Sequence, residues 1–248
     1  MTEILFALGL GNRIVGVTSF CDYPVEAKRK PKVGGMSNPS LEAVISLKPD
    51  VVVMTIDGNP REFEERLRSL GIKTYVFRAS RLRELPNGIR DLGKALDVQE
   101  EAETFAREFE SALKRIGAGE RKTATDTRSP RKRVLFIVWP EPLIAAGPGT
   151  VIDDALALIA LDNIASDSRV AYPKYSIEEI IRRAPEVIII GKGMERKDIE
   201  KISAGLLKRL RAVPAVKNKR VFYVSDDLYR LGPRTIRGIG EISRLVDR

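Results

Sequence analysis

Short apolar runs alternate with amphipathic stretches along most of this chain. Short apolar runs of this kind are typical of parallel strands that are buried on both faces. In the first 96 residues the predicted strands are Ile14–Val17, Val51–Met54 and Thr74–Phe77. Apolar residues at helical spacing predict helices over residues 2–10, 40–47 and 61–70. Residues 1–96 are therefore expected to form an α/β lobe with a mostly parallel sheet.

One helical pattern is much longer than the others. Between residues 97 and 117, apolar residues recur every three or four positions, and Asp97 with Glu100 has the form of a capping box. Gly117 is typical of a residue that ends a helix. At about 1.5 Å per residue, the predicted helix is roughly 30 Å long, enough to bridge two lobes. A long helix packed on a single sheet would have the same spacing.

Residues 118–132 differ from both flanks and are interpreted as a basic connector. Between residues 114 and 133 there are eight Lys or Arg against two Asp or Glu, so this stretch carries +6 of the net charge of +9. It has no apolar period and no aromatic residue that would stack on a nucleic-acid base. A solvated connector is therefore favoured over a nucleic-acid-binding patch.

The alternation resumes after the connector and predicts a second α/β lobe over residues 133–248. Its predicted strands are Val134–Val138, Val187–Ile190 and Val221–Val224. Its predicted helices are Thr150–Leu161, Ile177–Arg183, Lys201–Val213 and Gly232–Val246. The predicted fold class is α/β, with two Rossmann-like lobes joined by one long helix.

A gap-free internal repeat relates the two predicted lobes. Residues 40–54 align on residues 176–190, and each copy has a serine helix cap, a first-turn glutamate, about two turns of helix, a proline and a buried strand. The proline ends the helix because it disfavours α geometry in the residue before it and has no N–H to donate. The repeat indicates that the two lobes are structural counterparts.

Glu42 and Glu178 occupy the same position in the two copies. An acid in the first turn of a helix complements the helix dipole, which is a sufficient reason for either residue alone. Two acids at matched positions on two lobes also form a spaced anionic pair, which suits two basic sockets on a symmetric partner. For the pair, we favour the docking role over capping alone.

The composition excludes several kinds of chemistry. Histidine is absent and Cys21 is the sole cysteine, so Ser-His-Asp catalysis, His-bound metal and an internal disulfide are excluded. Cys21 is expected to be a small packed thiol. The sequence has neither a phosphate-binding loop nor a nucleophile-elbow motif. No apolar run is long enough to span a membrane, and the first residues lack the features of a secretory signal.

Aromatic and polar residues gather in loops that follow predicted strands or precede the repeat copies. They are Phe20, Asp22, Tyr23, Met36, Trp139, Tyr172, Tyr175, Asp226, Asp227, Tyr229 and Arg230. Parallel α/β sheets bind ligands beyond the carboxyl ends of their strands, so these loops are where a site is expected. Aromatic side chains beside an Asp and an Arg suit a large, flat, partly polar molecule.

Several ordered motifs resemble the periplasmic-binding-protein family, the substrate-binding proteins of ABC importers for vitamin B12, ferric siderophores and haem. The motifs are Thr2–Gly9, Val15–Pro24, Lys32–Gly35, Ser40–Asp50 and Gly147–Thr150, and they extend over nearly the whole chain. The resemblance implies two lobes bridged by a rigid helix, with the ligand held between them. Family members have a strand before the Thr-Glu pair found here at residues 2 and 3, so the first strand is expected to be missing from this sequence.

The resemblance also implies site residues. The likeness is greatest to the vitamin B12-binding members, whose corrinoid-contacting positions fall on Phe20, Met36, Ile144, Tyr172, Asp226 and Arg230. Their permease-docking glutamates fall on Glu42 and Glu178. Tyr23 and Trp139 join the ligand-binding candidates because they lie in the same loops. Met36 and Ile144 replace a tryptophan and a phenylalanine, so part of the aromatic wall is lost.

These features together predict a non-catalytic substrate-binding protein that delivers a cobalamin-like corrinoid to the transmembrane dimer of an ABC permease. It is expected to act outside the cytoplasmic membrane as a monomer, without a cofactor and without binding nucleic acid, although this sequence contains no signal or anchor segment. The first alternative is a ferric siderophore, bound by Arg230, Arg234 and Arg237, or haem, bound through Tyr23 or Tyr172. The second is a chelatase-like enzyme with paired Rossmann-like lobes.

Overall fold

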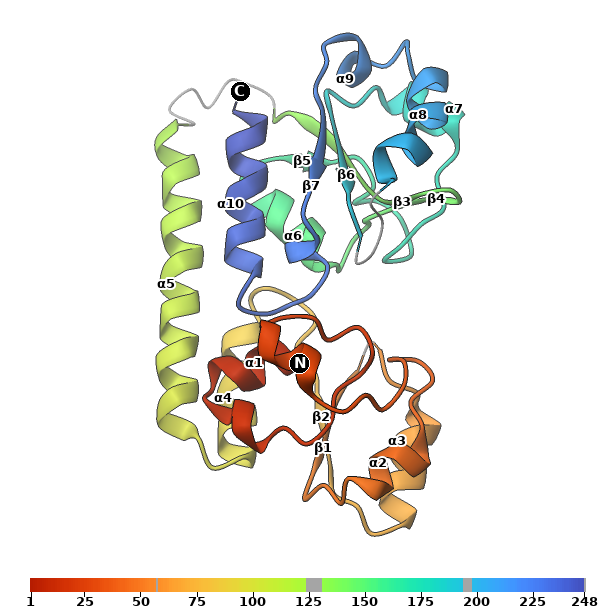
Figure 1. Cartoon of the computed structure of the whole chain (residues 1–248). Helices are drawn as coiled ribbons and strands as arrows, with labels where there is room; N and C mark the ends of the chain where they lie inside the picture. The colour runs from red at the N-terminus through yellow and green to blue at the C-terminus, as the bar shows by residue number, and fades with distance from the viewer. Residues whose placement is uncertain (57, 124–130, 194–197, 248) are drawn as a thin grey trace. The chain divides into compact units, whose positions relative to one another are not determined.

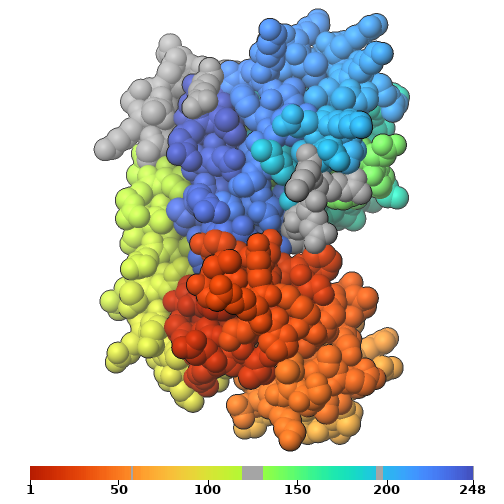
Figure 2. Space-filling view, in the orientation of Figure 1, coloured from red at the N-terminus to blue at the C-terminus, as the bar shows by residue number. Residues whose placement is uncertain are grey.

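The computed structural model describes residues 1–56, 58–123, 131–193 and 198–247. The chain divides into two compact units, Met1–Glu110 (unit 1) and Ser111–Arg248 (unit 2). Both units contain helices and parallel strands (Figure 1), and Figure 2 shows the outer face of each unit in the same orientation. The predicted α/β class is therefore confirmed.

Unit 1 contains a two-stranded parallel sheet among its described residues. Its helices are α1 (Thr2–Ala7), η1 (Leu10–Arg13), η2 (Val25–Arg29), α2 (Leu41–Ser46), α3 (Arg61–Ser69) and α4 (Leu85–Ala95). Its strands β1 (Val52–Thr55) and β2 (Thr74–Phe77) pair in register from Val52 with Thr74 to Thr55 with Phe77. Val44 of α2, Met54 of β1 and Leu67 of α3 form one buried core cluster of this unit.

Two expectations for the start of unit 1 are wrong. The helix predicted over residues 2–10 ends at Ala7, and Gly9 adopts a left-handed conformation (φ 74°) before the 3-10 turn η1. The strand predicted at Ile14–Val17 is reduced to a single bridge between Val17 and Lys32. In this parallel bridge the Val17 N–H donates to the carbonyl of Pro31 (2.9 Å) and the Val17 carbonyl accepts the N–H of Val33 (3.0 Å). Because Pro31 has no N–H to donate, the ladder does not extend back toward Ile14.

Within its described residues, unit 2 is built on a five-stranded sheet. The strands are β3 (Arg133–Pro140), β4 (Leu143–Ala145), β5 (Asp162–Asn163), β6 (Val187–Gly191) and β7 (Val221–Val224). The order is β4-β3-β6-β7, with β5 also paired to β3, and only β4 is antiparallel. Every residue of β6 is buried, as expected for a central parallel strand covered on both faces.

Helices cover both faces of this sheet. They are α6 (Val151–Leu158), α7 (Ile177–Arg183), α8 (Ile199–Arg209), α9 (Pro214–Lys217), the 3-10 turn η3 (Asp226–Leu228) and α10 (Thr235–Val246). Ile180 of α7, Ile199 of α8 and Ala215 of α9 share one buried cluster with residues of β3 and β6. Figure 1 shows α6 and α10 on the other side of the sheet.

The long helix α5 (Gln99–Thr123) crosses the boundary between the units and differs from the predicted span of 97–117. Asp97 is left-handed (φ 56°) and ends α4, because the Val98 N–H bonds back to the Gly93 carbonyl (2.9 Å) in a Schellman pattern. Gly117 does not end the helix, since a helical glycine costs only about 1 kcal/mol relative to alanine.

The predicted connector of residues 118–132 overlaps the end of this helix. Residues 118–123 belong to α5, and residues 124–130 lie outside the described part of the chain. The lobe boundaries at 96/97 and 132/133, and the bridging role of the helix, stay predictions. Within the described residues, no helix is both long enough and apolar enough to cross a membrane.

The internal repeat is reproduced in the structure, with one copy in each unit. The Ser40 hydroxyl accepts a hydrogen bond from the Ala43 N–H, and the Ser176 hydroxyl accepts one from the Glu179 N–H (3.1 Å in both). The pattern of buried and exposed residues is the same over 41–47 and 177–183. In both copies the helix is followed by a residue in the left-handed conformation with φ 46°, Lys48 in the first copy and Ala184 in the second. The two copies therefore share their local structure as well as their sequence pattern.

These two left-handed residues give a test of the repeat's local geometry. At φ > 0 a residue with a Cβ costs roughly 1–2 kcal/mol, and glycine avoids this cost. Glycine also has more conformational freedom in the unfolded chain, which offsets about half of the gain in stability. Lys48→Gly and Ala184→Gly should each stabilise the protein by about 0.5–1 kcal/mol in urea unfolding. Ala43→Gly, inside α2, is the control and should destabilise by about 1 kcal/mol. Destabilisation in all three variants would contradict the assigned helix ends.

Candidate functional site

Three of the predicted ligand residues lie in one loop of unit 1. The two ends of this loop are joined, because the Ser19 N–H donates to the Gly34 carbonyl (2.8 Å). Its side chains Phe20, Tyr23 and Met36 are 42%, 42% and 47% exposed. Large apolar side chains held this far into solvent are available to contact a ligand.

Met36 is anchored at the carboxyl end of strand β1. The Asn59 side-chain amide donates to the Met36 carbonyl (3.0 Å), and its oxygen accepts the N–H of Thr55, the last residue of β1 (2.9 Å). The Met36 side chain packs closely over Gly58, where a Cβ would lie 2.5 Å from the Met36 sulfur. Met36 therefore occupies the strand end at which a parallel α/β sheet is expected to bind ligand.

Cys21 lies in the same loop as a half-buried thiol. Its sulfur is 3.0 Å from the Thr2 hydroxyl and 3.2 Å from the Thr18 hydroxyl. These contacts link the loop to the first residue of helix α1. They agree with the expected packed thiol.

In unit 2, three more predicted ligand residues meet at the sheet edge formed by β3 and β4. Trp139 and Ile144 are partners in the antiparallel register of the two strands. Tyr172 lies in a segment that runs beside β4, since Ala145 N–H donates to the Pro173 carbonyl (3.0 Å) and Gly147 N–H to the Ala171 carbonyl (2.8 Å). The Tyr172 side chain is 55% exposed.

The remaining candidates, Asp226 and Arg230, follow strand β7 and flank a partly buried tyrosine, Tyr229. The Tyr229 hydroxyl donates to the Val138 carbonyl (3.0 Å), and its ring packs edge-on against Phe136 of β3 (centroids 6.2 Å apart). A side chain on Gly191, at the end of β6, would overlap the Tyr229 ring. Burial raises the pKa of Tyr229 above its usual range, and the charges of Tyr172 and Asp226 add to the shift.

Tyr229 thus connects the ends of strands β3, β6 and β7. The sequence alone does not reveal this role. The sequence places it among the loop aromatics, between Asp226 and Arg230, but it is not among the predicted ligand residues. Asn59 is a second such residue, and nothing in the sequence pattern singles it out. Both residues position neighbours that are candidates for ligand contact.

Asp227 joins the same loop to helix α10. It is 3% exposed and accepts hydrogen bonds from Arg237 Nη2 (2.9 Å) and Arg234 Nη1 (3.1 Å). Burial alone would raise the pKa of Asp227, but the two guanidinium groups outweigh it and the pKa is lowered. Arg234 also lies 3.3 Å from Asp226. Arg234 and Arg237, considered above as contacts for an anionic siderophore, thus pair with carboxylates of their own unit.

The two candidate docking acids are exposed in their separate units and have similar surroundings. Hydrogen bonds lower the pKa of Glu42, first from its own backbone N–H and then from the Ser40 hydroxyl, which donates to Glu42 Oε2 (3.0 Å). The pKa of Glu178 is lowered in the same order, by its own N–H and by Ser176, with a further contribution from the charge of Arg209. Both carboxylates are therefore negatively charged at neutral pH.

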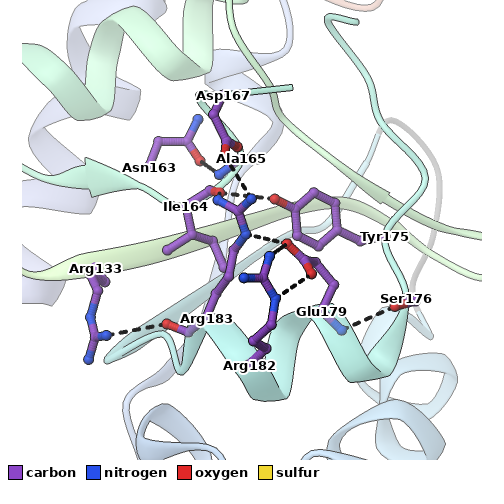
Figure 3. Close-up of polar contacts among 10 residues, drawn as sticks. All are labelled: Arg133, Asn163, Ile164, Ala165, Asp167, Tyr175, Ser176, Glu179, Arg182 and Arg183. Carbon is purple, nitrogen blue, oxygen red and sulfur yellow. Dashed lines mark hydrogen bonds and ion pairs between the residues drawn. The ribbon is translucent and has the colours of Figure 1, made fainter. Parts of the chain in front are cut away.

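A polar network ties helix α7, which carries Glu178, to the segment that leads to Tyr172 (Figure 3). Arg183 donates to the Ile164 carbonyl (2.6 Å) and to Asp167 Oδ2 (2.7 Å), and it also pairs with Glu179. The Tyr175 hydroxyl donates to the same carbonyl (2.9 Å). Hydrogen bonds from Arg182 and Arg183 lower the pKa of Glu179 to about 2. A candidate docking acid and a candidate ligand loop therefore belong to one connected part of unit 2.

No group of three or more Cys, Asp or Glu side chains among the described residues is arranged to hold a metal ion. The predicted site residues instead offer apolar surface with a few polar groups. That is the chemistry of binding a bulky organic molecule.

Comparison with known proteins identifies the family. Residues 1–228 match the family model of the periplasmic binding proteins. The chain belongs to this family. The family consists of substrate-binding proteins and not of enzymes, as the sequence predicts, so the chelatase-like alternative is set aside.

Two relatives illustrate the match in sequence. The chain is 30% identical over 242 residues to the vitamin B12-binding protein of Pectobacterium carotovorum, covering 97% of this chain and 83% of the relative. It is 32% identical over 250 residues to an uncharacterized ABC transporter substrate-binding lipoprotein of Bacillus subtilis, covering 99% and 76%.

Two solved structures illustrate the match in fold. The periplasmic vitamin B12-binding protein of Vibrio cholerae superposes with a TM-score of 0.83 at 26% identity, over 99% of this chain and 92% of that one. The periplasmic haem-binding protein of Roseiflexus has a TM-score of 0.81 at 28% identity, over 98% and 93%. The fold is thus shared by proteins named for two different cargoes.

The Asp227 cluster makes a pH-dependent contribution to stability. Because its folded pKa lies below the unfolded value of about 3.9, this contribution is present above that pH and is lost as the pH falls through the folded pKa. Asp227→Asn should cost about 2–3 kcal/mol in urea unfolding at pH 7, with a smaller difference from wild type near pH 3. The control, Glu186→Gln, removes the half-exposed pair with Arg133 and should cost less than about 1 kcal/mol. An equal loss at both pH values would contradict the ion-pair assignment.

Proposed function

We propose that the protein is the substrate-binding component of an ABC importer, that its cargo is a cobalamin-like corrinoid, and that it acts outside the cytoplasmic membrane. The observation that carries the proposal is the exposure of Phe20, Tyr23, Met36 and Tyr172, large side chains at sites predicted for ligand contact. A corrinoid has a broad ring with apolar faces and a rim of amide groups. Exposed aromatic side chains suit the faces, and Asp226 and Arg230 suit the rim.

The relatives support this assignment of cargo and partner. The relative at 30% identity is named a vitamin B12-binding protein, and the one at 32% identity is named an ABC transporter substrate-binding lipoprotein. A partner permease follows from that role, and the exposed, charged Glu42 and Glu178 are the residues proposed to dock on it.

A second cargo, haem, has one specific observation in its favour. Tyr172 and Tyr23 are exposed phenols in a chain without histidine, and a tyrosinate is an established axial ligand of haem iron. The similarity to a haem-binding protein in structure is consistent with this second candidate.

The cargo is tested by calorimetric titration with cyanocobalamin, haemin and a ferric hydroxamate. We expect cyanocobalamin to bind at micromolar concentration or below, and Phe20→Ala and Tyr172→Ala each to weaken it by about tenfold. Leu70→Ala is the control, because Leu70 is 54% exposed but outside the candidate site. The double variant Tyr23→Phe, Tyr172→Phe separates the two cargoes: it keeps the rings that pack on a corrinoid and removes both phenols that could bind haem iron. Binding of haemin alone, abolished by this double variant, would replace the corrinoid with haem.

The docking role is tested with the double variant Glu42→Ala, Glu178→Ala in transport assays with the cognate permease in proteoliposomes. It should keep its affinity for ligand but reduce stimulation of the permease ATPase by tenfold or more, about the size seen when charged pairs at interfaces are broken. Glu62→Ala is a matched control, because Glu62 is likewise an exposed acid at the second position of its helix, α3. Wild-type stimulation by the double variant would return both acids to a capping role.

A further inference from the structure

Helices α2 and α7, which carry the two proposed docking acids, each also expose an isoleucine. Ile45 of α2 is 42% exposed and Ile181 of α7 is 45% exposed. Each lies three residues after the glutamate of its helix, and residues three apart are neighbours on one helix face. The buried side of each helix is occupied by another residue, Val44 or Ile180. Neither isoleucine is therefore needed to hold its helix on the core.

The match between the two copies is selective. Among the aligned helix residues 41–47 and 177–183, only the glutamate and the isoleucine are identical. The positions between and beside them differ: Ala43 aligns with Glu179, and Ser46 with Arg182. A single exposed apolar side chain needs no explanation. The same β-branched side chain, exposed to the same extent beside the same acid in both units, points to a shared contact.

We propose that Ile45 and Ile181 are the apolar half of the permease-docking surface, each forming a two-point patch with its glutamate. The proposal rests on the docking role given above. The partner it fits is the two-fold symmetric permease dimer, with one basic side chain and one adjoining apolar socket on each subunit. Closed dimers of this kind present the same surface twice, which matches one patch in each unit of this chain.

The two halves of each patch have different physical roles. The charged glutamates act over a distance and set the approach and register of the partners, and salt screens them. The isoleucines act only in contact, and removing their apolar surface from water slows dissociation at any salt concentration. Glutamate and isoleucine variants should therefore weaken docking with different salt dependence.

The test is the binding of the full protein to its cognate permease in nanodiscs, followed by surface plasmon resonance at about 0.05 M and 0.5 M salt. The double variant Ile45→Ser, Ile181→Ser should dissociate roughly 10- to 100-fold faster at both salt concentrations. The double variant of Glu42 and Glu178 should lose mainly association rate, and most of its defect should disappear at high salt. Both positions are exposed, so thermal unfolding should match wild type.

Leu70→Ser is the control for loss of an exposed aliphatic side chain outside the patches. If the isoleucine variant dissociates like this control while the glutamate variant is defective, the proposal for Ile45 and Ile181 is overturned and the docking role stands. If neither the glutamate nor the isoleucine variant differs from the control, the docking role itself fails.

Discussion

Two serine hydroxyls, each accepting one backbone N–H, begin the short helices on which the proposed docking surface depends. A helix of six or seven residues is unstable alone in water, because nucleation costs more than one or two turns recover. Ser40 and Ser176 hold the first turns, Val44 and Ile180 anchor the middle in the core, and a left-handed residue ends each helix. Because its start, middle and end are fixed in this way, each helix presents one face to solvent, and that face carries the glutamate and the isoleucine.

In unit 2, hydrogen bonds between distant parts of the chain hold helix α7 and the candidate ligand loops in place. Arg183 holds α7 to the segment before Tyr172, and Tyr229 holds the loop after β7 to the end of β3. Loops held by the fold lose little freedom when a ligand binds, which lowers the entropic cost of capture. The first copy has Ala43 and Leu47 at the positions of Glu179 and Arg183, so this reinforcement belongs to unit 2.

The sequence predicts elements well where local chemistry decides their ends. Strands β2 and β7 and helix α7 have the predicted bounds, because apolar runs, a serine cap and a proline mark them. The predictions fail where local preferences are weak. Gly117 continues a helix although glycine often ends one, and Asp97 ends the preceding helix instead of beginning the next. Residues 14–17 have the composition of a strand, but their neighbour is a proline that cannot complete the ladder.

The candidate site was predictable only in part, for a related reason. Tyr229 acts through a carbonyl 91 residues away, and no local pattern encodes such a contact. Ile45 shows the opposite case: the repeat makes it visible in the sequence, yet the sequence cannot tell it from Val44, since both have the composition of core residues. Only the fold places one inside and the other in solvent. Sequence identity between the copies becomes evidence for a shared contact once the exposure of the identical residues is known, because core packing no longer explains it.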